Sequence, residues 1–371
     1  MSVAAAVASL DAQTKRMVEA SLDRFVDQAY DPAARHARLR RGALDHREFW
    51  PVLAELGVPA LPVAEALGGI GGSTLDVSDA LRILARGLVL EPLVEGVVIA
   101  AALLGRLADA ERAVAPLLSG EVLTVLVGGR RGDALRCAER DGALRLDGTA
   151  RVVPGAGQAD RWLIACADAG GRPCLLGVAR GEVEAVLRCY RMMDGREAGD
   201  VEFHAARVGA GAVLLRGEPA RAALDAAAAQ AVSAYCADAA GVMQCLVAQT
   251  GEYLRTREQF GVTLGSFQAL QHRYADMHMA ALEARAMARE IARAIDAGDP
   301  ERVAWLRYAA PTVAARAGAR VGHEAIQMHG GMGVSDELIV SHYNARLVVL
   351  AQLLARWQAE AGAGMPMPGA H

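Results

Sequence analysis

Aromatic residues are scarce in this chain, at 4% of its 371 residues, and neither sign of charge is in large excess. Lys and Arg total 39 against 43 Asp and Glu, which gives a formal net charge of −4. The lack of a basic excess argues against a nucleic-acid-binding protein. Apolar residues make up 53% of the chain, largely as alanine and leucine, so disorder is excluded. Because alanine favours helices, we expect long packed helices.

Long hydrophobic runs and recognisable targeting segments are also missing. The most apolar stretch, from Gly96 to Gly105, lies between Glu95 and Arg106 and is too short to span a bilayer. The N-terminal segment has no charged lead-in before its apolar run, so we expect no secretory signal, no membrane partner and a cytoplasmic protein. The six cysteines form no CxxC pair, which favours reduced packing cysteines, and the histidine spacing predicts no metal site.

Three regions of the chain differ in their residue pattern. Residues 1–120 read as helical, and residues 121–217 contain short extended runs with Asp-Gly turns. In residues 218–371 apolar side chains recur every three or four positions, which predicts one buried stripe per helix. Asp299-Pro300 is typical of a helix start, and Asp336 is expected to cap the following helix. The sequence therefore predicts a mainly α protein with an N-terminal helical domain (1–120), a middle β-barrel or sandwich domain (121–217) and a C-terminal four-helix bundle (218–371).

The segment RTREQFGVTLGSFQALQ, residues 255–271, joins the first two bundle helices. Arg257 ends one helix, and a guanidinium there can make paired hydrogen bonds to a diphosphate. Phe260 is suited to pack on a flat ring, and Gln268 is suited to bind an adenosine group. The alternative interpretation is a polar corner between two helices with a buried Phe as its staple.

A second segment, IQMHGGMGVSDE at residues 326–337, ends another helix at Gly330-Gly331. Backbone without Cβ atoms lets a ligand approach closely, and Gln327 lies one turn earlier. The alternative interpretation is a helix C-cap and turn. The glycines of residues 67–72 follow no strand, so a dinucleotide-binding site of the Rossmann type is not indicated and a flexible loop is expected.

Together, REQFG and Q..HGG.G on long helices after a small β region resemble the acyl-CoA dehydrogenase family. The stretches ALGGIGGSTLDVSDALRILARGLVLEP and RMMDGREAGDVEFHAARV extend the resemblance over nearly the whole chain. It implies a flavoprotein oxidoreductase that uses FAD to desaturate an acyl-CoA thioester, works as a tetramer and passes electrons to an electron-transfer flavoprotein. In this family FAD lies between the β domain and the bundle of one subunit, and its adenosine diphosphate end reaches a neighbouring subunit.

The resemblance assigns the candidate cofactor contacts by position. Arg257 matches the diphosphate-binding arginine, and Phe260 and Gln268 match contacts to the neighbouring subunit. Gln327, Gly330 and Gly331 match the contact near the adenosine.

The catalytic side of the family pattern is missing. The usual position of the catalytic glutamate falls on Leu354, and a second known position for the base falls on Ala231. Neither Asp225 nor Asp238 matches a base position, so no catalytic residue is assigned. The β-domain contacts to the flavin are also replaced, by TVLVGGRRGDA and by ARVVPGA. A general base typically contributes on the order of 10²–10⁴-fold to the rate, which leucine cannot supply.

Three hypotheses follow. The leading one resembles the smaller, base-less subunit of heteromeric acyl-CoA dehydrogenases, which act in fatty acid or steroid side-chain catabolism. Such a subunit donates its FAD contacts in trans to a homologous catalytic partner in a heterotetramer. The second is a self-sufficient homotetrameric acyl-CoA dehydrogenase with a displaced carboxylate base, for which the candidates are Glu360, Asp225 and Asp238. The third is a non-enzymatic scaffold that binds an acyl-CoA or a partner protein.

Overall fold

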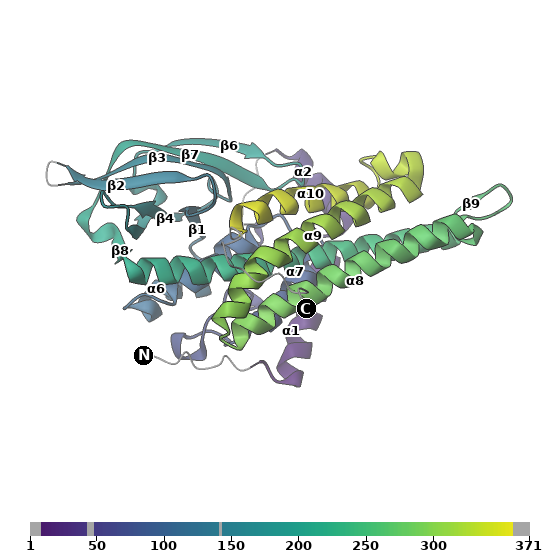
Figure 1. Cartoon of the computed structure of the whole chain (residues 1–371), viewed down its shortest axis with the longest axis horizontal. Helices are drawn as coiled ribbons and strands as arrows, with labels where there is room; N and C mark the ends of the chain where they lie inside the picture. Colours follow the sequence, from purple (N-terminus) through teal and green to yellow (C-terminus); the bar gives the residue numbers. More distant parts are fainter. Residues whose placement is uncertain (1–8, 43–47, 141–142, 359–371) are drawn as a thin grey trace, which may run out of the picture.

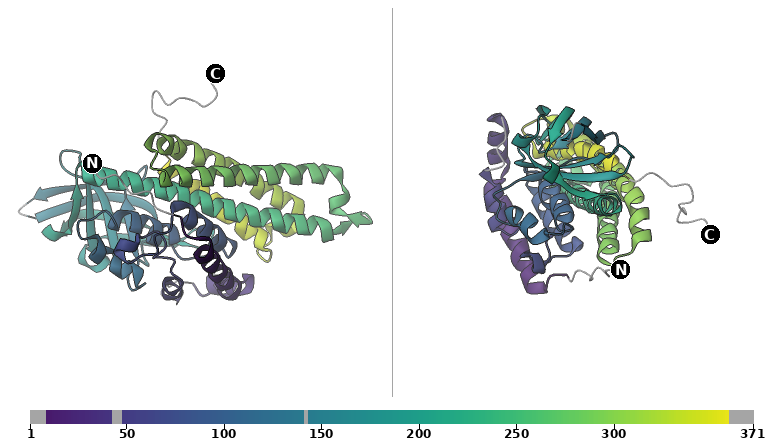
Figure 2. Two further views of the ribbon diagram at one scale, coloured as in Figure 1. Left: turned by 90° about the horizontal axis from the view of Figure 1, so that it is seen from below. Right: turned by 90° about the vertical axis from the view of Figure 1, so that its left-hand side faces the viewer.

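The computed structural model describes residues 9–42, 48–140 and 143–358. It is mainly helical, with a β sheet in the middle of the chain and long helices in the C-terminal part, so the predicted fold class is confirmed. Figure 1 shows the sheet at one end of the molecule and the long helices extending away from it. Figure 2 shows the N-terminal helices lying along one side of both.

The described residues of the N-terminal part form six α-helices and two further helical turns. The α-helices are α1 (Ala12–Ala29), α2 (Pro32–Arg40), α3 (Trp50–Glu55), α4 (Thr74–Arg86), α5 (Ala100–Leu104) and α6 (Ala110–Leu118). The turns are η2 (Glu65–Leu67) and a π-helical segment, η3 (Val94–Ile99), that leads directly into α5. The most apolar stretch of the sequence largely coincides with η3 and α5. Most of its apolar residues are buried in the hydrophobic core.

The glycine-rich stretch before α4 is held in place by backbone hydrogen bonds instead of forming a flexible loop. Gly71 and Gly72 donate to the carbonyls of Val63 and Leu61, each at 2.8 Å. A Cβ atom built on Gly69 would lie 2.0 Å from the Val63 carbonyl oxygen. Glycine is therefore required here by close backbone packing, with no need to invoke a ligand.

We expect Gly69→Ala to lower the free energy of unfolding by about 1–3 kcal/mol, because the new methyl group must push two backbone segments apart. Chemical denaturation of the full chain measures the change. Gly209→Ala is the matched control, since a Cβ there meets nothing within 4 Å and the φ of −61° suits alanine. Equal stability of the two variants would show that the packing of the two segments is looser than described.

The sheet carries the β-strands of the middle region in the order β6-β7-β3-β2-β4-β5-β8, and β1 pairs with β4. The strands are β1 (Thr124–Gly128), β2 (Ala134–Arg140), β3 (Ala143–Pro154), β4 (Arg161–Ala167), β5 (Pro173–Ala179), β6 (Val186–Arg191), β7 (Glu197–Val208) and β8 (Val213–Arg216). β1 runs parallel to β4, whereas β4 and β5 are antiparallel. β1 is buried along its whole length and packs against η3 and α5.

Four long helices form the C-terminal bundle: α7 (Glu218–Thr256), α8 (Gln268–Asp296), α9 (Pro300–His329) and α10 (Ile339–Trp357). The predicted start of α9 is confirmed, because Asp299 caps it and Pro300 is its first residue. The expected cap at Asp336 is wrong, since α10 begins at Ile339 after Leu338. The length and hydropathy of α7 would suffice to cross a membrane, but 83% of its most apolar window is buried inside the molecule.

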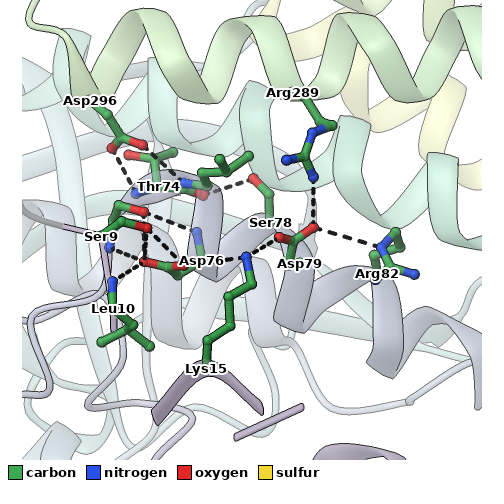
Figure 3. Close-up of polar contacts among 12 residues, drawn as sticks. Ser9, Leu10, Lys15, Thr74, Asp76, Ser78, Asp79, Arg82, Arg289 and Asp296 are labelled. Atoms are coloured by element: carbon green, nitrogen blue, oxygen red, sulfur yellow. Dashed lines mark hydrogen bonds and ion pairs between the residues drawn. The ribbon is translucent and has the colours of Figure 1, made fainter. Parts of the chain in front are cut away.

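A polar network connects the start of α4 to the end of α8 (Figure 3). The Asp296 carboxylate accepts hydrogen bonds from the backbone N–H groups of Thr74 and Leu75, at 2.7 and 3.1 Å. Lys15 and Arg289 both contact the carboxylate of Asp79, at 2.6 and 3.1 Å. These contacts attach the N-terminal helices to the bundle, so the two parts orient each other.

Candidate functional site

The connection between α7 and α8 is a projecting tip at the end of the molecule farthest from the large sheet (Figure 1). It consists of two short antiparallel strands, β9 (Glu258–Gln259) and β10 (Val262–Thr263), joined by Phe260 and Gly261. Both turn residues have positive φ, 58° and 78°, as a tight two-residue hairpin turn requires. Glycine adopts this conformation freely, but a phenylalanine in it is strained by roughly 1–2 kcal/mol.

Phe260 is also 91% exposed. Its ring forms an edge-to-face pair with Phe267, with ring centroids 6.3 Å apart. The predicted alternative of a buried Phe staple is therefore wrong. An exposed aromatic ring held in a strained turn adds nothing to the core of its own chain, which points to a contact with another molecule.

Two polar side chains lie at the ends of the helices that this tip connects. Arg257 is the C-cap residue of α7, and among the described residues no hydrogen bond or ion pair engages its guanidinium. By contrast, the guanidinium of Arg255, one position before the end of α7, is paired with Glu252. Gln268 is exposed and is the first residue of α8, as predicted. The tip therefore offers a free guanidinium, an amide and an aromatic face.

The second predicted segment ends α9. Gly330 is its C-cap residue with φ 61°, and Gly330 and Gly331 lie in the short helical turn η7 (Gly330–Val334). A Cβ atom built on either glycine would meet nothing within 4 Å, so the space above this backbone is open. Gln327 is exposed one turn earlier. This segment thus presents open backbone together with a side-chain amide.

A stacked ring pair joins the two segments. The rings of Tyr253 on α7 and His329 on α9 have centroids 4.3 Å apart and planes inclined by 29°. The Tyr253 hydroxyl donates to the His329 carbonyl at 3.5 Å, and Nδ1 of His329 lies 2.8 Å from the carbonyl of Ala325. The structure therefore brings the ends of α7 and α9 together, which sequence spacing alone did not indicate.

Acidification is expected to weaken this junction. Burial lowers the pKa of His329, although the hydrogen bond with Ala325 acts in the opposite direction. The unfolded chain, with an ordinary histidine pKa of about 6.5, then binds a proton that the folded chain resists. The free energy of unfolding should fall as the pH drops from about 6.5 towards the lowered pKa. Denaturation curves at pH 7.5 and 5.5 measure this loss of free energy of unfolding. The loss should be smaller in His329→Gln than in the wild-type chain, and an equal loss in both proteins would contradict the prediction.

Comparisons with known proteins agree with this architecture. Residues 12–121 match the model of the acyl-CoA dehydrogenase N-terminal domain, and residues 220–352 match that of the acyl-CoA dehydrogenase C-terminal domain. The chain belongs to the acyl-CoA dehydrogenase family. It is 28% identical over 316 residues to acyl-CoA dehydrogenase FadE27 of Mycobacterium tuberculosis, which covers 80% of this chain and 81% of that protein.

Solved structures of the family share the fold. The ChsE4-ChsE5 complex from Mycobacterium tuberculosis superposes with a TM-score of 0.84 at 26% identity, covering 94% of this chain and 95% of that chain. Butyryl-CoA dehydrogenase from Megasphaera elsdenii superposes with a TM-score of 0.80 at 20% identity, covering 92% and 96% of the two chains.

The two positions to which the resemblance assigns a catalytic base are apolar and buried. Leu354 is 1% exposed on α10, and Ala231 is fully buried on α7. Neither side chain can accept a proton. The structure therefore offers no base at either family position.

The carboxylates suggested as displaced bases are unsuited or lie elsewhere. Asp225 is exposed, 3.5 Å from Arg307. Asp238 is buried, and Arg346 holds its carboxylate at 2.9 Å. Glu360 lies outside the described residues.

One buried carboxylate was missed by sequence reasoning. Glu95 on η3 is 2% exposed, accepts a hydrogen bond from the hydroxyl of Tyr235, and has a second oxygen without a hydrogen-bond partner. Tyr235 lies four residues after Ala231 and so on the same face of α7. Burial, followed by the charge of Glu95, raises the pKa of Tyr235. No local motif marks Glu95, because only the packing of η3 on α7 brings it near a family base position.

Charged side chains pack between the sheet and the end of α10. Arg130 is buried, and its guanidinium lies 6.0 Å from the ring of Trp357 at the end of α10. Arg356 contacts Asp133 at 2.5 Å. Asp133 precedes β2 and Arg130 follows β1, so the end of α10 packs directly on the loop between these strands.

A buried ion-pair cluster, defined as Asp194, Arg196, Asp238 and Arg346, fills the neighbouring space. Arg346 contacts Asp238 at 2.9 Å and Asp194 at 3.1 Å, and Arg196 contacts Asp194 at 2.7 Å. Burial alone would raise the pKa of Asp194, but the charges of Arg196 and Arg346 outweigh it and lower that pKa. The cavity beside the cluster has a volume of about 10 Å³, which is room for about one water.

Proposed function

We propose that this chain is the non-catalytic subunit of a heteromeric, FAD-dependent acyl-CoA dehydrogenase. In this role it donates Arg257, Phe260, Gln268 and the turn from Gln327 to Gly331 to FAD that is held mainly by a homologous catalytic subunit. The observation that carries the proposal is the strained, exposed Phe260 in the same hairpin as Arg257, whose guanidinium has no partner in the part of the chain that the structure describes. Both lie at the end of the molecule opposite its own sheet. Residues in this place are suited to contact a cofactor bound in another subunit.

The chemistry of the tip fits the nucleotide end of FAD. The planar fork of a guanidinium matches a diphosphate, an amide can both donate to and accept from an adenosine, and an aromatic face can stack on a ring. The interior fits the flavin ring poorly. Arg130, Trp357 and Arg356 occupy the contact between sheet and bundle, and the cavity beside the ion-pair cluster is small.

The proposed division of labour follows from the reaction. Bound FAD supplies the hydride acceptor for α,β-desaturation, and a carboxylate of the partner removes the α-proton of the acyl-CoA thioester. This chain contributes binding and orientation, since its two family base positions are Leu354 and Ala231. Its relatives include a complex named ChsE4-ChsE5, which supports a two-subunit assembly, and we expect an electron-transfer flavoprotein to accept the electrons. A steroid or fatty acyl-CoA is the proposed substrate class, consistent with a structural neighbour named as a steroid acyl-CoA dehydrogenase.

Purification with and without a partner tests the proposal. The partner to express is a family member from the same source that carries glutamate at a family base position. We expect this chain alone to bind little flavin and the pair to bind flavin and to desaturate acyl-CoA. Stoichiometric flavin and turnover by the chain alone would refute the proposal.

A self-sufficient enzyme remains the second candidate, and the free oxygen of Glu95 is the observation that favours it. In that case Glu95→Gln would abolish turnover by the isolated chain while retaining bound flavin. The scaffold hypothesis makes the opposite prediction, namely a preparation that stays colourless with every partner.

A further inference from the structure

Three cysteines gather on one face of the sheet, at the end of the molecule opposite the tip (Figure 1). Cys166 on β4 and Cys174 on β5 are directly paired across the two antiparallel strands. β2 lies on the other side of β4, where Arg136 pairs with Ala167. Side chains alternate between the two faces of a sheet, so Cys137 and Cys166, each next to one of these residues, lie together on the face opposite to Arg136 and Ala167. We call Cys137, Cys166 and Cys174 the thiol cluster.

The three thiols lie close together inside the sheet. All three residues are buried, with exposed fractions of 3%, 7% and 1%. The thiol of Cys137 is within hydrogen-bonding reach of both other thiols. None of the cluster is in a disulfide. A reactive thiol with a second thiol beside it is the arrangement found at redox-sensitive sites.

A pocket of about 270 Å³ opens beside Cys137 and gives small molecules access to it. Its charged lining consists of two ion pairs. Arg172 contacts Asp168 at 2.9 Å, and Arg216 lies 3.9 Å from Glu139. Arg216 is also the strand partner of Cys174. A small uncharged oxidant such as hydrogen peroxide can enter a pocket of this size without meeting an uncompensated charge.

The environment favours the thiolate form of Cys137. Hydrogen bonding with Cys166 lowers the pKa of Cys137 to about 7, against an opposing effect of burial and with further lowering by Cys174 and Arg216. Burial raises the pKa of Cys174 to about 11. Cys137 is therefore more readily ionised than Cys174.

We propose that Cys137 is a peroxide-reactive thiol that closes to a disulfide with one of the two thiols that contact it. The Cys137 thiolate attacks one oxygen of hydrogen peroxide, the O–O bond breaks, and the released hydroxide takes up a proton to form water. The sulfur of the second thiol then attacks the Cys137 sulfenic acid, the S–S bond forms, and the S–O bond breaks to release a second water. Two thiols thus lose two electrons and one peroxide becomes two waters.

Peptide mapping by mass spectrometry tests this on the full chain, reduced first and then treated with one equivalent of hydrogen peroxide at pH 7. We expect a cross-linked pair of peptides that contains Cys137 together with Cys166 or Cys174. At pH 5.5 the reaction should be several-fold slower than at pH 7, because the fraction of thiolate falls as the pH is lowered. Cys137→Ser should abolish the cross-link, and Cys189→Ser, which removes an exposed thiol outside the cluster, should leave it intact.

Competition within the wild-type chain keeps the test independent of how Cys137→Ser folds. Burial raises the pKa of Cys189, so Cys189 should be oxidised more slowly than Cys137 despite its greater exposure. Oxidation of Cys189 before the cluster, a cross-link that persists at the same rate in Cys137→Ser, or a rate that does not depend on pH would each overturn the proposal.

Discussion

Arg346→Ala is expected to lower the free energy of unfolding by about 3–5 kcal/mol, the largest stability effect of any single substitution considered. Arg346 is 4% exposed and bridges Asp194 from the sheet region and Asp238 from α7. Its removal leaves Asp238 buried without its ion-pair partner, so that Arg196 is the nearby positive charge for both carboxylates. A buried carboxylate without a counter-charge must either be solvated or be protonated, and both outcomes weaken the contact between sheet and bundle.

Chemical denaturation of the full chain measures this loss. Arg316→Ala is the matched control, because its ion pair with Glu283 has the same charges but is 67% and 50% exposed on the two sides. Exposed pairs contribute about 0–1 kcal/mol, so the control should be close to wild type. A loss below about 1 kcal/mol for Arg346→Ala would mean that water reaches the cluster. In that case the interface would be open enough to reconsider it as a ligand site.

The sequence predicted those elements whose signals are local. Apolar residues at helical spacing and the Asp299-Pro300 start are sufficient to define α9, because the side chain of Asp299 caps the helix with no help from the rest of the fold. Asp336 failed as a cap for a local reason. Its backbone carbonyl lies 2.9 Å from His342 Nε2, and Asp336 and Glu337 form a turn before Leu338, so the helix begins later than its polar residues indicate.

The candidate functional residues also fall into those that local sequence signals predict and those that they do not. The tip is predictable because its residues are close together in the sequence and share one turn. Glu95 and the thiol cluster were not recognised, since their meaning depends on which segments become neighbours. Cys137 and Cys166 are 29 positions apart in the numbering and share a face only because β2 lies beside β4. The same six cysteines, taken by spacing alone, indicated nothing beyond packing.

Arg257→Ala is expected to weaken FAD binding by the complex of this chain with its catalytic partner by roughly 10–150-fold. A hydrogen-bonded contact to a charged group contributes about 1.5–3 kcal/mol, which converts to this range. The guanidinium is free of any partner among the described residues, so its removal costs the isolated chain little. The effect should therefore appear in the flavin affinity of the complex, measured by fluorescence titration of the apo-complex with FAD, and not in the stability of this chain.

Arg255→Ala is the control, because it removes the same charge from the same end of α7. Arg255 is two residues away at the same exposed end of α7, but Glu252 already engages its guanidinium. If the tip acts only through its general positive charge, both variants should weaken FAD binding alike and the effect should fade with added salt. If Arg257 meets the diphosphate directly, only its variant should lose affinity, and most of the loss should persist at high salt. Unchanged affinity in Arg257→Ala would show that the tip does not touch the cofactor, and the proposed donation in trans would then be wrong.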